Sequence, residues 1–182
     1  MLTKLKSLLF GTAVAASQVA AEGAPPIDVN VAVTNPNLLA AIERLKTDTS
    51  EDAKDALLLE LNRSNYLVAI FADEMHTSET DENGQSVVEK DSIIKVLNTS
   101  DRNGNMYLPL FTDWDALRKY IDQPVSTLVF PPQDAWHWAL EMGEYHGIVI
   151  NPAENALPLN RGQIQYLANQ DAANKAKQKD AQ

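Results

Sequence analysis

The sequence predicts an α+β fold, in which helices pack on a mixed, mostly antiparallel sheet of about five strands and an N-terminal α-hairpin precedes the sheet. Two helical patterns follow one another in residues 36–61, with a short polar turn between them. Strand-like and helical segments then alternate through residues 66–167. One strand-like run, residues 66–71, is apolar throughout, which is typical of a strand covered on both faces.

The two helices of the hairpin have recognisable starts. The first is expected at Asn35-Pro36, because a proline at the first helical position lacks an N–H that would have no partner there. The second is expected to start within residues 48–52, where hydroxyls and carboxylates can accept hydrogen bonds from the N–H groups of a first turn. The apolar faces that they would bury are Leu38, Leu39, Ile42 and Leu45 in the first helix and Ala53, Leu57, Leu58 and Leu61 in the second.

The chain between residues 101 and 105 predicts a tight hairpin turn joining a strand at 93–97 to one at 106–111. Its Asp and Asn side chains suggest calcium ligands. An EF-hand loop, however, places glycine sixth and glutamate twelfth, whereas here Gly104 is fourth and Thr112 is twelfth. The turn is therefore not expected to hold a metal ion. A polar loop with Asn83-Gly84 at its turn precedes this pair of strands.

Three more helices and three more strands complete the predicted order. Thr112 and the acid three residues later form a loose capping box, and the helix that follows would bury Trp114, Leu117 and Ile121. The remaining elements are a strand at 125–130, a helix at 135–142, a strand at 147–152, a short edge strand at 157–159 and a helix capped by Asn160.

The N-terminus predicts a signal peptide over residues 1–21. Lys4 and Lys6 precede a short apolar run, and small residues ending in Ala21 then fit a cleavage site. The run is too short and too rich in alanine for a stable membrane span, which needs about 20 apolar residues. The protein is thus expected to be exported or periplasmic, and the alternative is a cytoplasmic protein that keeps this segment as an N-terminal helix. Residues 22–34 would be an extended linker, 35–168 the folded domain and 169–182 a polar, frayed helical tail.

Composition excludes several function classes. The net charge is −10, from 25 acidic and 15 basic residues, which argues against a nucleic-acid partner because such affinity comes largely from clustered Lys and Arg. The absence of cysteine excludes disulfides, thiolate metal sites and cysteine nucleophiles. No cofactor is predicted, since no glycine-rich phosphate loop follows a strand.

Several segments, in this order, resemble the N-terminal domain of the SseB family, the bacterial "enhanced serine sensitivity" proteins. The resembling segments are Asn35-Pro36 with Leu38, residues 65–68, the turn at 101–105 before residues 108–112, residues 148–152 and residues 161–164. The resemblance covers roughly residues 35–168 and implies the fold more than an activity. Longer family members carry a second, C-terminal domain, which we do not expect in these 182 residues. The family name comes from a growth phenotype and implies no reaction, substrate or cofactor.

No catalytic motif is visible, so we expect a protein that is not an enzyme. A serine nucleophile elbow of the form Gly-x-Ser-x-Gly is missing, and His76, His137 and His146 lack the spacing of a zinc site. The alternative is a small exported hydrolase in which His146 acts as a general base oriented by a carboxylate such as Glu144.

The aromatic residues suggest a binding surface for a protein or peptide. Trp136 and Trp138 are two apart on a predicted helix, so they cannot share one face, and at least one is expected to be partly exposed. With Asp134 and Tyr145 they form the candidate binding site. Trp114, by contrast, is expected in the core because its spacing to the apolar residues of its helix is that of a buried stripe.

Export can be tested directly. If residues 1–21 are a signal peptide, N-terminal sequencing of the protein isolated from its native host should find a chain that starts after Ala21, because the leader is removed on translocation. An intact Met1 on a cytoplasmic pool of the protein would contradict the prediction.

Overall fold

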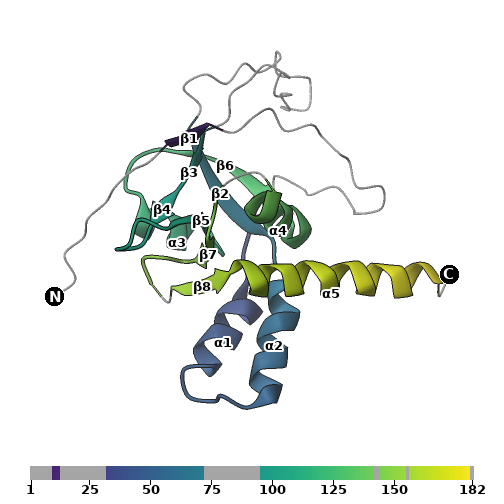
Figure 1. Cartoon of the computed structure of the whole chain (residues 1–182). Coiled ribbons are helices and arrows are strands. Elements are labelled where there is room, and N and C mark those ends of the chain that lie inside the picture. The colour runs from purple at the N-terminus through teal and green to yellow at the C-terminus, as the bar shows by residue number, and fades with distance from the viewer. Residues whose placement is uncertain (1–9, 13–31, 72–94, 142–143, 155, 181–182) are drawn as a thin grey trace, which may run out of the picture.

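The computed structural model describes residues 10–12, 32–71, 95–141, 144–154 and 156–180, and these residues form an α+β fold (Figure 1). The helices are α1 (Pro36–Arg44), α2 (Glu51–Leu61), α3 (Trp114–Tyr120), α4 (Pro132–Glu141) and α5 (Arg161–Asp180). The strands are β1 (Phe10–Thr12), β2 (Tyr66–Phe71), β3 (Lys95–Leu97), β4 (Thr99–Ser100), β5 (Met106–Leu110), β6 (Ser126–Phe130), β7 (Gly147–Ile150) and β8 (Leu157–Asn160). The predicted order is confirmed, with β1 and β4 added.

The strands form two sheets where one was predicted. The described strands make a four-stranded sheet in the order β1-β3-β2-β6 and a second in the order β4-β5-β7-β8. All neighbours are antiparallel except β5 and β7, which are parallel. The single predicted sheet was wrong because periodicity locates strands but carries no information about which strands pair. The sheets meet where Leu67 and Phe111 exchange both backbone hydrogen bonds, at 2.9 and 3.0 Å.

Strand β2 is buried on both faces, as its continuous apolar sequence predicts. Because side chains alternate along a strand, its residues divide between two hydrophobic clusters. Tyr66, Val68 and Ile70 belong to the larger cluster, which includes residues of α1, α2, α4 and α5. Leu67 and Ala69 belong to the smaller cluster, which includes residues of α3. Helices α3 and α4 therefore pack on opposite faces of this strand.

The α-hairpin of α1 and α2 is confirmed and extends from the body at one end (Figure 1). Ser50 caps α2, since its hydroxyl accepts a hydrogen bond from the Ala53 N–H at 3.3 Å. In the turn between the helices, the Asp48 carboxylate accepts hydrogen bonds from Ser50 and from Arg44, and these lower the pKa of Asp48 to about 2. Asp48 therefore stays ionised, and the turn stays bonded, down to acidic pH.

Helix α4 buries both of its tryptophans, and the expectation that one would be exposed is wrong. Its buried side is formed by Pro132, Ala135, Trp136, Trp138 and Ala139. At about 100° per residue, the two indoles lie at opposite edges of an arc of about 160° whose centre is formed by the alanines. Trp136 packs against Tyr66 with a centroid distance of 5.7 Å, and Trp138 against Phe130 at 5.4 Å. The small central residues let the helix sit deeply enough for both edges to be covered.

Helix α5 starts with a reciprocal cap, as predicted at Asn160. The Gln163 N–H donates to the Asn160 side chain at 3.0 Å, and the Gln163 side chain accepts from the Asn160 N–H at 2.9 Å. Ile164 and Leu167, in the first turns of this helix, are buried in the core. The backbone remains helical to Asp180 and runs beyond the body of the domain (Figure 1), which agrees with the helical part of the predicted frayed helical tail.

A turn at 101–105 is confirmed, but it joins β4 to β5 as a hairpin. The strand at 93–97, predicted as the partner of β5, is β3 over its described part and pairs with β1 and β2 in the other sheet. Gly104 has a φ of 83°, and its N–H donates to the Asp101 carbonyl at 3.2 Å. The Asp101 carboxylate accepts hydrogen bonds from the Asn103 and Asn105 N–H groups and from the Asn105 side chain. These bonds lower the pKa of Asp101, and the bond from the Asn105 side chain has the largest effect. The Asp and Asn side chains thus bind each other and the backbone.

Some predictions lie outside the described residues. They are the rest of the predicted leader, most of the linker at 22–34, the loop with Asn83-Gly84, the first part of the strand at 93–97 and His76.

Replacement of the buried Trp136 should be strongly destabilising. Trp136→Ala removes a fully buried indole and should lower the free energy of unfolding by about 3–5 kcal/mol. Trp114→Ala, at a residue 38% exposed, should cost much less. Urea denaturation followed by circular dichroism would measure both. Equal losses in the two variants would contradict the burial described above.

Candidate functional site

The residues predicted as a binding surface do not form one in the folded chain. Asp134 is exposed in the first turn of α4, but Trp136, Trp138 and Tyr145 are buried. The Trp136 indole N–H donates to the Asn62 side chain at 2.8 Å, and the Tyr145 hydroxyl donates to the Asn98 side chain at 2.7 Å. Burial raises the pKa of Tyr145. These three aromatic side chains belong to the core, and Trp136 and Tyr145 bind the side chains of the half-buried Asn62 and the buried Asn98.

A polar network, buried at Thr112 and Asn151, joins four segments that are far apart in the sequence. The Thr112 N–H donates to the Asn151 side-chain oxygen at 3.1 Å, and the Asn151 amide donates to the Thr112 hydroxyl at 2.8 Å. The Asn35 amide donates to the carbonyls of Thr112 and Asn65, at 2.7 and 2.8 Å. Asn151 has a φ of 48°, a conformation that asparagine tolerates better than most residues. The network fixes the end of β5 relative to β7 and the start of α1.

The network leads directly into the start of α3. The Thr112 hydroxyl donates to the Asp113 carboxylate at 2.9 Å, and that carboxylate accepts from the Ala116 N–H at 2.8 Å. Asp113 is therefore the N-cap, and the cap predicted at Thr112 was placed one residue too early. The hydroxyl of Thr112 cannot cap α3 because it is held in the buried network.

Trp114 is exposed, and its predicted place in the core is wrong. It is the first residue of α3, and it lies about 110° around the helix from the middle of the face formed by Ala116 and Leu117. Ile121, the third residue of the predicted stripe, is buried but lies beyond the helix end. A helix of only seven residues leaves its first side chain at the rim of the core.

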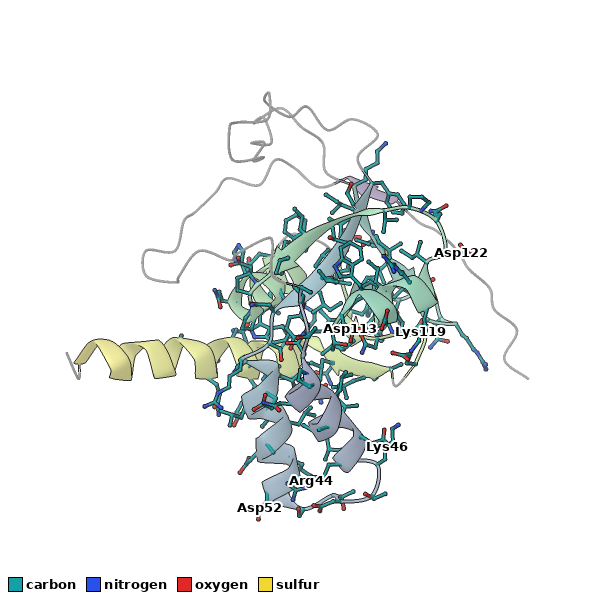
Figure 2. All side chains as sticks on the ribbon, turned by 180° about the vertical axis from the view of Figure 1, so that it is seen from behind. Arg44, Lys46, Asp52, Asp113, Lys119 and Asp122 are labelled. Atoms are coloured by element: carbon teal, nitrogen blue, oxygen red, sulfur yellow. The ribbon has the colours of Figure 1, made fainter. Side chains whose placement is uncertain are left out.

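Trp114 and Arg118 form a contact on this surface, which we call the Trp114–Arg118 pair. The guanidinium carbon of Arg118 lies 5.9 Å from the centre of the indole, within cation–π range. Lys119, one residue on, forms an ion pair with Glu154 in the segment after β7, and this hydrogen bond raises the pKa of Lys119. Figure 2 shows Asp113 and Lys119 on the face that carries α3, well apart from Arg44, Lys46 and Asp52 on the hairpin.

Among the described residues, the His146 side chain has no hydrogen bond to the carboxylate or hydroxyl that the hydrolase alternative requires. His137 and His146 are both exposed. The Asp101 carboxylate is near enough for His146 to contribute to lowering the pKa of Asp101, although the Asn105 hydrogen bond is the larger cause. The His146 backbone N–H donates to the Met106 carbonyl at 2.7 Å. Within the same ranges, no group of three His, Asp or Glu side chains could hold a metal ion. No described helix is long and apolar enough to cross a membrane.

Two polar side chains, Arg161 and Asn62, fasten the C-terminal helix to the rest of the domain. Arg161 donates to the carbonyls of Ala139, Leu140 and Tyr145, at 2.8–3.2 Å, and so closes the end of α4. The amide of Asn62 donates to the Leu167 carbonyl at 3.2 Å. Asn62 thereby links α2 to both α4 and α5. Both side chains support the backbone, and this role leaves them no evident part in a binding site.

The Trp114–Arg118 pair is the surface feature that sequence reasoning missed. The two residues are four apart, which is the spacing at which helical side chains meet, and this signal was available. The spacing of Trp114 to Leu117 and Ile121, however, predicted a buried tryptophan and so no surface contact with Arg118. The buried network of Asn35, Thr112 and Asn151 could not be found in the same way, because its members are 39 and 77 residues apart in the chain.

The buried network should contribute measurably to stability. Thr112→Val keeps the shape of the side chain but removes its hydroxyl, which leaves the Asn151 amide without its partner and should cost about 1–3 kcal/mol of unfolding free energy. Thr112→Ser keeps the hydroxyl and is the matched control, with a smaller expected loss. Chemical denaturation would measure both. If the valine variant were as stable as the wild-type protein, the network would have no energetic role.

Comparison with known proteins identifies the domain. The family model described as "SseB protein N-terminal domain" matches residues 38–165, which is most of the chain. Comparisons with curated proteins and with solved structures found no match. The matched range contains α2 to β8 and the Thr112–Asn151 part of the buried network. The chain therefore belongs to the SseB family, through that family's N-terminal domain.

Proposed function

We propose that this protein is a non-catalytic binding or regulatory module that recognises a protein or peptide partner, and that it acts outside the cytoplasm after loss of residues 1–21. That loss would remove β1 and leave β3 as the edge of the first sheet. The location rests on the order of basic, apolar and small residues at the N-terminus. The binding role rests on one observation above all, the exposed Trp114–Arg118 pair at the start of α3.

An exposed tryptophan with an arginine beside it fits a binding role. Trp and Arg are among the residue types that most often dominate the energy of protein interfaces. Trp114 is exposed to 38%, and its indole is already restricted by Arg118, so ordering it on binding would cost little side-chain entropy. Asp113 and the network below it fix the start of the helix that carries it. The support is therefore rigid.

The Trp114–Arg118 pair takes the place of the surface expected around Asp134. With Trp136 and Trp138 in the core, Asp134 has no exposed aromatic side chain next to it on α4. The other large apolar side chains that the described residues expose are Leu59 on α2 and Tyr166 on α5. Neither has a described cation–π partner. Tyr166 is therefore a suitable control for the importance of aromatic exposure as such.

Affinity capture from the native compartment would test this proposal. The tagged wild-type protein should retain a partner that mass spectrometry identifies. Trp114→Ala should weaken binding of that partner by about thirtyfold, which corresponds to about 2 kcal/mol for a central interface anchor. Tyr166→Ala should leave the affinity unchanged. Both variants should keep the wild-type melting temperature within a few degrees, because each residue is exposed.

The outcomes separate the competing surfaces. If Tyr166→Ala abolished capture and Trp114→Ala did not, the partner would bind α5 and the proposed surface would be wrong. For the hydrolase alternative, His146→Ala is the informative variant. Loss of a hydrolytic activity on its introduction, with the fold intact, would contradict a non-catalytic role.

A further inference from the structure

Arg118 is placed between potential acidic partners but does not bind them. Asp115 precedes it by three residues, a spacing at which helical ion pairs form, and Asp122 follows it by four. Elsewhere in the described chain this kind of spacing is used, as in Arg44 with Asp48 and Lys54 with Glu51. For Arg118, no carboxylate of the described residues lies within ion-pair distance, and the guanidinium lies over the Trp114 ring.

The polar groups of the pair are hydrogen-bond donors that have no acceptor in the described structure. An arginine has five N–H donors and no acceptor, and an indole has a single N–H donor. Neither side chain donates a hydrogen bond to any described residue. The neighbouring charged groups differ in this respect, because Asp113 is bonded to Ala116 and Lys119 is paired with Glu154. The two side chains of the pair thus offer donors without acceptors, which fits a ligand that accepts, although the exposed carboxylate of Asp115 lies beside them.

We propose that the Trp114–Arg118 pair binds a carboxylate, the Asp or Glu side chain of an acidic peptide segment whose neighbouring apolar residue packs against the exposed indole. This inference deepens the proposed function and rests on it. The guanidinium of Arg118 lies 5.9 Å from the centre of the Trp114 ring and forms no ion pair in the described structure, so its N–H groups are available for two parallel hydrogen bonds to a carboxylate. A peptide that binds there would contact the indole and the guanidinium together.

The surrounding charges favour a carboxylate over a more highly charged anion. Asp115 is exposed next to the pair, and the chain as a whole has a net charge of −10. One guanidinium balances the single negative charge of a carboxylate. A phosphate group carries about −1.5 to −2 charges at neutral pH and would be repelled more strongly by the same surroundings.

Selection from a random peptide library would test the inference. Peptides displayed on phage would be selected on the folded full-length protein, and the affinity of an enriched peptide would be measured by fluorescence anisotropy. Its twin, with the acidic residue replaced by the corresponding amide, would be measured beside it. The protein variants are Trp114→Ala, Arg118→Ala and, as the control, Arg102→Ala, which alters another exposed arginine for which the described structure has no ion pair.

The expected result is enrichment of Asp or Glu next to an apolar residue. Arg118→Ala and the amide twin should each raise the Kd by about tenfold or more, because each removes a charge-assisted hydrogen bond. Combined, they should have little more effect than either alone, since both remove the same contact. Arg102→Ala should leave the Kd unchanged.

Two other results would overturn the inference in different ways. Peptides that depend on Trp114 but show no acidic enrichment, or that bind Arg118→Ala as well as wild-type protein, would exclude a carboxylate site and leave the binding module standing. If no selected peptide depended on Trp114, the proposed function at this surface would fail as well.

Discussion

The double burial of β2 is the constraint on which the rest of the structure depends. Its side chains alternate between two hydrophobic clusters, so both faces of the strand must be covered by helices. Removing either cover would expose a strand that is apolar on both sides. The backbone exchange between Leu67 and Phe111 attaches the second sheet to the same strand. The helices and both sheets therefore all contact β2.

The residues that carry the family pattern support the backbone. Asn35, Thr112 and Asn151 bind one another or main-chain groups in the buried network, and Arg161 closes the end of α4. Thr112 and Asn151 are fully buried, and buried polar groups that are paired fix one arrangement of the chain because any other leaves costly unpaired groups. The pattern therefore includes residues that hold the shape of the domain.

The same buried network places the exposed pair. Thr112 holds Asp113, Asp113 caps α3, and the first residue of that helix is Trp114. One residue beyond Arg118, the ion pair of Lys119 with Glu154 connects α3 to the segment after β7. A side chain at the end of a short helix would otherwise be loosely held. Here it stands on a support that reaches into the core, as a binding anchor requires.

The amino-acid sequence alone was enough to predict the order of the elements apart from β1 and β4, the starts of α1, α2 and α5, the turn at Gly104 and the family. These features depend on residues that are close together in the sequence or on the order of motifs along it, so they can be predicted without knowledge of the fold. Only the tertiary structure decided that β5 and β7 pair in a second sheet, that Trp136 and Trp138 are both buried and that Trp114 is not. Contacts between distant segments decide which strands pair and how deeply a helix is buried. The periodicity of the sequence carries no information about those contacts.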